Sequence, residues 1–146
     1  MTATPDDQSA MILTRRVVDP SWLTEFLASA TRGCLRTDRA DLIIAGSLKS
    51  RPRVIVLDAS TGSAAADQTA DPKADAAWLE DALTACRRLK RDAFTGIIPV
   101  LMLVPDGSFA AAFEAGADEV LRDDVHPEEA ATRVRVMLRR SDRDVD

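Results

Sequence analysis

Short apolar runs alternate along the chain with longer segments in which apolar residues recur at helical spacing. The runs are four to eight residues long and rich in Val, Ile, Leu and Met, which is typical of strands covered on both faces. The pattern therefore predicts five strands, at residues 11–14, 34–37, 53–57, 97–104 and 118–122.

The segments between these runs carry helix signals. Pro20 follows Asp19, and Gly33 closes the stripe of apolar residues between them, as expected at the start and end of a helix. The segment 41–45 could be read as a strand, but we favour a helix because a crossover between parallel strands needs about a dozen residues. The other predicted helices span 39–49, 75–90, 108–115 and 127–140.

Regular strand–helix alternation predicts an α/β domain with a parallel sheet between two layers of helices. The domain is expected at 11–140, between a disordered leader at 1–10 and a frayed charged tail at 141–146. A long surface loop is expected at 59–73, where small and polar residues predominate.

The apolar spacing also predicts which side of each helix faces the sheet. In the helix 39–49 the inward residues are expected to be Leu42, Ala45 and Leu48. In the last helix they are expected to be Ala131, Val134 and Leu138.

Composition and charge exclude several classes of protein. The 146 residues carry 19 basic and 24 acidic side chains, a net charge of −5, which disfavours a general nucleic-acid binder. Two cysteines and one histidine exclude a disulfide scaffold and a histidine–cysteine zinc site, and we expect Cys34 and Cys86 to be small core residues. The sequence has no apolar run long enough to span a membrane and no signal peptide, so we expect a cytoplasmic protein.

Three blocks of sequence stand out: Val54–Asp58, residues 82–90 with 98–103, and residues 113–121 with 127–139. Together they resemble the receiver domains of response regulators, the CheY-like domains, and are most similar to those attached to diguanylate cyclases. Val54–Asp58 is similar to the strand that ends at the phosphate-accepting aspartate. Residues 82–90 followed by 98–103 are similar to the third helix and fourth strand, and residues 113–121 with 127–139 to the closing strand–helix unit. The resemblance implies a flavodoxin-like fold with strand order 2-1-3-4-5 and a site at the carboxyl ends of the strands.

The resemblance also implies a set of pocket positions, and most of them have changed. Receivers hold Mg²⁺ with an acidic pair and the acceptor aspartate, contact the phosphoryl group with Thr or Ser and Lys, and carry a switch aromatic on strand 5. In this chain the acceptor position is Asp58, the acidic pair is Arg15 and Arg16, the Thr or Ser is Val104, the Lys is Asp123, and the aromatic is Val120.

These changes oppose phosphotransfer. Two guanidinium groups would repel Mg²⁺, Val104 cannot donate to a phosphoryl oxygen, and the carboxylate of Asp123 would repel one. We therefore expect no bound Mg²⁺ and no other cofactor. The charges would either form a closed cluster, in which Arg15 or Arg16 pairs with Asp58, or lie separately in solvent.

The resulting hypothesis is a degenerate receiver domain, a pseudo-receiver without enzymatic activity, that acts through protein contacts independently of phosphorylation. The alternatives are a working receiver phosphorylated on Asp58 by a histidine kinase and a small α/β enzyme or nucleotide binder. Neither a nucleic acid nor a membrane is expected as partner. We expect a signalling protein or a second copy to bind the face made by the fourth helix, fifth strand and fifth helix, which carries Arg133, Arg135, Arg139 and Arg140.

Overall fold

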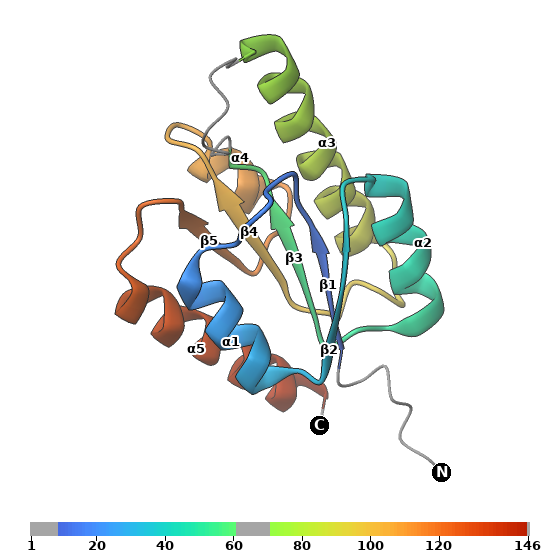
Figure 1. The fold of residues 1–146 in the computed structure, drawn as a ribbon. Coiled ribbons are helices and arrows are strands. Elements are labelled where there is room, and N and C mark those ends of the chain that lie inside the picture. Colours follow the sequence, from blue (N-terminus) through green and yellow to red (C-terminus); the bar gives the residue numbers. More distant parts are fainter. Residues whose placement is uncertain (1–8, 61–70, 146) are drawn as a thin grey trace.

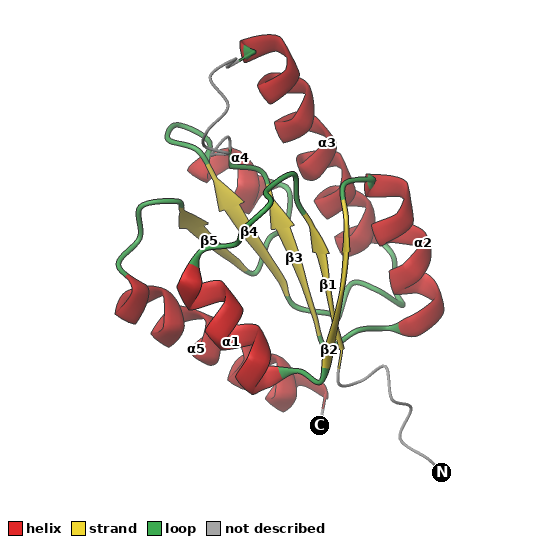
Figure 2. Cartoon of the chain, in the orientation of Figure 1, coloured by secondary structure: helices red, strands yellow, loops and turns green. Residues whose placement is uncertain are grey.

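The computed structural model describes residues 9–60 and 71–145, with side chains as far as Asp142. Five strands and five helices alternate along this part of the chain (Figures 1 and 2). The strands are β1 (Ser9–Leu13), β2 (Gly33–Thr37), β3 (Val54–Asp58), β4 (Val100–Val104) and β5 (Glu119–Arg122). The helices are α1 (Ser21–Ala30), α2 (Ala40–Ser50), α3 (Pro72–Arg91), α4 (Phe109–Glu114) and α5 (Pro127–Val145).

The strands form one parallel sheet in the order β2-β1-β3-β4-β5, which confirms the predicted fold class and strand order. In Figure 1, α1 and α5 lie on one side of this sheet, and α2, α3 and α4 lie on the other. All five strands run in the same direction, so their carboxyl ends meet at one edge of the sheet.

Two apolar cores fill the spaces between the sheet and its helices. The strands alternate in the face to which each residue points, so Ile55 and Leu57 pack toward α2, α3 and α4, whereas Val54 and Val56 pack toward α1 and α5. All four side chains are fully buried. This double burial explains why β3 reads as a continuous apolar run in the sequence.

The inward face of α2 differs from the predicted one. Leu42 and Leu48 are 44% and 45% exposed and Ala45 is also exposed, whereas Ile43 and Ser47 are fully buried. Apolar residues occupy every position from 42 to 45, so spacing alone did not decide which side packs. The neighbouring edge strand β2 is itself exposed along most of its length.

Several element boundaries also differ from the predicted ones. Helix α3 begins at Pro72 because the side chain of Asp71 accepts hydrogen bonds from the backbone N–H groups of Lys73 and Ala74, so the predicted loop is shorter at its end. The rest of that loop, 61–70, lies outside the described residues. Strand β4 begins at Val100 instead of residue 97, because the preceding residues form a turn.

The domain is also longer at both ends than the sequence pattern indicated. Strand β1 includes residues 9 and 10, and α5 continues to Val145. In α5 the fully buried alanine is Ala130, one position before the predicted Ala131, and Met137 is buried as well.

The two cysteines have different environments, which corrects the prediction that both are core residues. Cys34 lies exposed on β2, whereas Cys86 is buried in α3 and burial raises the pKa of its thiol to about 11. In the folded protein at mildly alkaline pH, iodoacetamide should alkylate Cys34 and leave Cys86 unmodified, while denaturant should expose both. Peptide mass mapping checks this, and equal labelling of the two in the native state would contradict the assigned burial of α3.

Candidate functional site: a closed acceptor pocket

Asp58 is the last residue of β3, and its carboxylate is enclosed by hydrogen-bond donors. Its side chain is 0% exposed. Oδ1 accepts hydrogen bonds from the Ser60 backbone N–H at 3.1 Å and the Ser60 hydroxyl at 2.6 Å. Oδ2 accepts one from the Thr14 hydroxyl at 3.3 Å. The buried carboxylate of Asp58 therefore lies at the carboxyl edge of the sheet, and the segments that follow β1 and β3 surround it.

The Arg16 guanidinium fills the remaining side of this carboxylate. Its Nε lies 2.7 Å from Asp58 Oδ2 and its Nη2 lies 3.4 Å from Oδ1, so the two groups meet along parallel edges. The same Nη2 donates to the Ser60 hydroxyl and to the Asp123 carboxylate. Arg16 thus connects the segments that follow β1, β3 and β5 at a single point.

The positive charge of Arg16 is balanced by two carboxylates, those of Asp58 and Asp123. Burial alone disfavours the charged form of Arg16, but its hydrogen bonds and attraction to Asp123 and Asp58 outweigh that effect and raise its pKa above the ordinary value. The side chain of Arg16 is 14% exposed, whereas that of Asp123 is 41% exposed. Asp58 is therefore the buried partner, and Asp123 is the outer one.

Arg15 does not contact Asp58. It forms an ion pair with Asp75 of α3 at 2.9 Å and lies over the Trp78 ring, with 5.1 Å between the guanidinium carbon and the ring centroid. The indole N–H of Trp78 donates to the Asp58 backbone carbonyl at 2.8 Å. Arg15 and Trp78 therefore tie the beginning of α3 to the pocket, and only Arg16 enters it.

Val104 and Val120 are the residues expected from the sequence at the hydroxyl and switch-aromatic positions. Both are fully buried and belong to the core beneath α3 and α4. Neither side chain has a group that can exchange hydrogen bonds with the pocket. At these two positions the contacts between β4, β5 and the overlying helices are therefore apolar packing.

The four arginines of α5 do not form one surface. Arg133 lines a hollow between α4, β5 and α5 and pairs with Glu129 at 2.9 Å. Arg135 shares a shallow hollow on α5 with Arg133 and also lines a groove between α1 and α5, and Arg139 is exposed. Arg140 lies at the opposite edge of the sheet from the Asp58 pocket. Arg133 and Arg135 of the predicted interaction face thus lie together, whereas Arg140 lies apart from them.

Three residues of the pocket were not assigned a role from the sequence: Thr14, Ser60 and Trp78. Ser60 was detectable, because a serine two residues after an aspartate can donate its backbone N–H to that carboxylate in a local turn. Thr14 and Trp78 come from other elements and carry no comparable local signal.

Within residues 9–60 and 71–145, no group of three or more His, Cys, Asp or Glu side chains is arranged to hold a metal ion. No helix of that part combines the length and apolar character needed to cross a membrane.

Solved structures share this architecture. A response regulator receiver modulated diguanylate cyclase from Pelobacter carbinolicus aligns over 95% of this chain and 98% of its own, with a TM-score of 0.64 and 16% identity. A response regulator receiver domain protein from Clostridium thermocellum aligns over 92% and 96%, with a TM-score of 0.60 and 14% identity. The chain has the fold of a response-regulator receiver domain.

One curated protein also resembles part of this receiver-fold chain. The DNA-binding dual master transcriptional regulator RpaA of Synechocystis is 46% identical over 66 residues, which are 43% of this chain and 27% of RpaA. The matched segment is thus about a quarter of the length of RpaA. No protein-family model matches the chain.

Proposed function

We propose that this receiver-fold domain is a pseudo-receiver, a signalling module that acts by binding other proteins and does not depend on phosphorylation of Asp58. The observation that carries this proposal is the position of Arg16. Its guanidinium donates hydrogen bonds to both oxygens of the Asp58 carboxylate. A nucleophilic oxygen held in this way is neither free nor accessible to a phosphodonor.

The donor set around Asp58 does not fit the magnesium ion that receivers use. Mg²⁺ prefers several carboxylate and water oxygens in octahedral geometry. Here both oxygens of Asp58 already accept hydrogen bonds, and the charged group beside them is the Arg16 guanidinium. We therefore propose that Mg²⁺ does not bind and that Arg16 supplies the positive charge in its place.

A small-molecule phosphodonor tests this proposal. The whole chain is incubated with acetyl phosphate and Mg²⁺, beside a receiver domain that accepts phosphate, and intact masses are measured. We expect no phosphate adduct on this chain under conditions in which the control is modified. An adduct that is absent from the Asp58→Asn variant would overturn the proposal and establish the alternative, a working receiver.

The face of α4, β5 and α5 is the proposed surface for a second copy or a signalling partner. Phe109 and Phe113 are both exposed and pack edge to face, with 5.2 Å between ring centroids. Arg122 and Arg133 lie near Asp124 and Glu119 on the same face, so opposite charges can meet across a two-fold axis. Because Val120 replaces the switch aromatic, this surface would be constitutively available.

Removing one of these rings should weaken self-association. Phe113→Ser is expected to shift the chain toward monomer at a concentration at which the wild type is dimeric, because exposed aromatic anchors contribute much of an interface's affinity. Sedimentation velocity measures the shift. Leu35→Ser, which changes another exposed apolar residue on β2, is the control and should leave the association unchanged. A wild type that remains monomeric at high concentration would exclude the homodimer and leave a different protein as the partner.

A further inference from the structure

The turn between α3 and β4 is held rigidly at the amino edge of the sheet, opposite the Asp58 pocket. Thr95 is buried, and its hydroxyl donates to the Leu89 carbonyl at 2.7 Å. The Asp92 carboxylate accepts the backbone N–H groups of Phe94 and Thr95. A Cβ on Gly96 would lie 2.7 Å from the Asp92 carbonyl oxygen, so the turn requires glycine there. These constraints fix the positions of the residues on either side of Thr95.

This rigid turn directs two large apolar side chains into solvent. Phe94 is 43% exposed and Ile97 is 50% exposed, although the backbone between them is anchored in the core. Side chains held in place before binding lose little conformational entropy when a partner covers them. Exposed apolar groups on such a turn are therefore well suited to docking.

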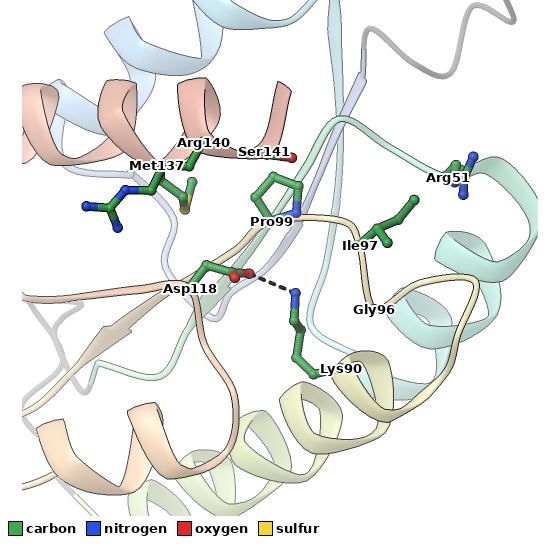
Figure 3. Close-up of a pocket in the computed structure, with 9 residues that line it drawn as sticks. All are labelled: Arg51, Lys90, Gly96, Ile97, Pro99, Asp118, Met137, Arg140 and Ser141. Carbon is green, nitrogen blue, oxygen red and sulfur yellow. Dashed lines mark hydrogen bonds and ion pairs between the residues drawn. The ribbon is translucent and has the colours of Figure 1, made fainter. Parts of the chain in front are cut away.

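Positive charge surrounds these apolar groups. Ile97 lines a pocket of about 570 Å³ together with Arg51, Lys90 and Arg140, and Met137 and Pro99 supply apolar lining (Figure 3). Lys90 is paired with Asp118 at 2.8 Å, and this pair lies between Arg51 and Arg140 in the view of Figure 3. In the part of the chain that the structure describes, no carboxylate lies within ion-pair distance of the Arg51 or Arg140 guanidinium.

Arg51 occupies a backbone position that favours glycine. It caps the end of α2 with φ of 51°, in the left-handed region that residues with a side chain rarely adopt. Its guanidinium lies over the Phe94 ring, 4.7 Å from the centroid. Arg51 thus adopts an unfavourable backbone conformation, and its charge lies against the exposed ring of Phe94.

We propose that this surface, defined by Arg51, Phe94, Ile97 and Arg140, binds an acidic segment of a partner protein that also carries apolar side chains. The two arginines would pair with carboxylates of the segment, and an apolar residue would enter the pocket beside Ile97. Two observations favour a peptide over a nucleic acid. The surface carries exposed apolar groups, and the whole chain has a net charge of −5. This inference rests on the proposed interaction function, but it does not depend on whether Asp58 accepts phosphate.

Selection from a display library of short random peptides on the folded whole chain tests the proposal. We expect the selected sequences to combine Asp or Glu with apolar residues. A synthetic peptide of the selected sequence should bind roughly tenfold or more weakly to the variant Arg51→Glu/Arg140→Glu. Arg39→Glu/Arg87→Glu, which makes the same change of charge away from the pocket, should bind as the wild type does.

Two further variants keep the test decisive. Arg51→Gly removes one charge while placing the residue that the α2 end prefers, so it should weaken peptide binding without loss of fold. Ile97→Ser should weaken binding as well. Because this variant leaves every charge in place, a loss of affinity would show that apolar contact contributes to peptide binding. Selected peptides that are neutral or basic, affinity unchanged in Arg51→Glu/Arg140→Glu, or equal binding of a DNA duplex to the same surface would each overturn the proposal. None of these outcomes alters the phosphodonor result, so the two proposals fail separately.

Discussion

Replacing Asp58 with alanine should destabilise the protein by about 3–5 kcal/mol, the range for removal of one member of a buried ion pair. The Asp58 carboxylate is fully buried and accepts hydrogen bonds from Thr14, Arg16 and Ser60. Without it, the charge of Arg16 loses its buried partner and keeps only the outer carboxylate of Asp123. In a receiver that has an acidic acceptor pocket, the same substitution would instead relieve repulsion between carboxylates. Chemical denaturation with far-UV circular dichroism measures the difference in free energy of unfolding.

Asp123→Ala is the matched control for this substitution. It removes the other carboxylate bound to Arg16, but that side chain is 41% exposed, so the loss should stay below about 1 kcal/mol. Equal losses of unfolding free energy in Asp58→Ala and Asp123→Ala would mean that the greater burial of Asp58 does not make its ion pair with Arg16 more important for stability. A denaturation midpoint that is unchanged or raised by Asp58→Ala would remove the ion-pair explanation of the pocket.

Ile43→Ala should cost about 2–5 kcal/mol, as truncation of a large buried aliphatic side chain does. Ile43 is fully buried in the core between α2 and the sheet. Chemical denaturation measures this loss as well. The variant tests which side of α2 faces the sheet.

Leu42→Ala, at the neighbouring position, separates the two possible faces of α2. Leu42 is half-exposed, so its truncation should cost less than about 1 kcal/mol. A larger loss for Leu42→Ala than for Ile43→Ala would restore the face that the sequence pattern predicts and contradict the packing described for this helix.

Most of the fold followed from the sequence because strands buried on both faces leave an unambiguous apolar run. Val54–Asp58 is the clearest example, since every residue of β3 is buried. The pattern failed where burial is one-sided or incomplete. Helix α2 has apolar residues on adjacent positions around its axis, and the edge strand β2 provides little cover, so spacing could not identify its buried side.

The candidate site was only partly predictable for a related reason. The positions of Asp58, Arg16 and Asp123 followed from the expectation that parallel strands end at one edge of the sheet. Which arginine enters the pocket depends on the path of the segment after β1, and there the Thr14 hydroxyl accepts the Arg16 backbone N–H at 3.0 Å. That local contact, and the indole of Trp78 from α3, are set by tertiary packing that no motif in the sequence encodes.

The ¹⁵N–¹H signal of the Arg16 Nε–H group measures directly whether the Arg16 guanidinium is held against the Asp58 carboxylate. At neutral pH the account predicts a resolved signal that exchanges slowly with solvent, because this N–H lies 2.7 Å from Asp58 Oδ2 in a largely buried pair. The signal should disappear or exchange rapidly in Asp58→Asn and persist in Asp123→Asn. An Arg16 signal that exchanges as fast as that of the exposed Arg139 in the wild-type protein would contradict the account.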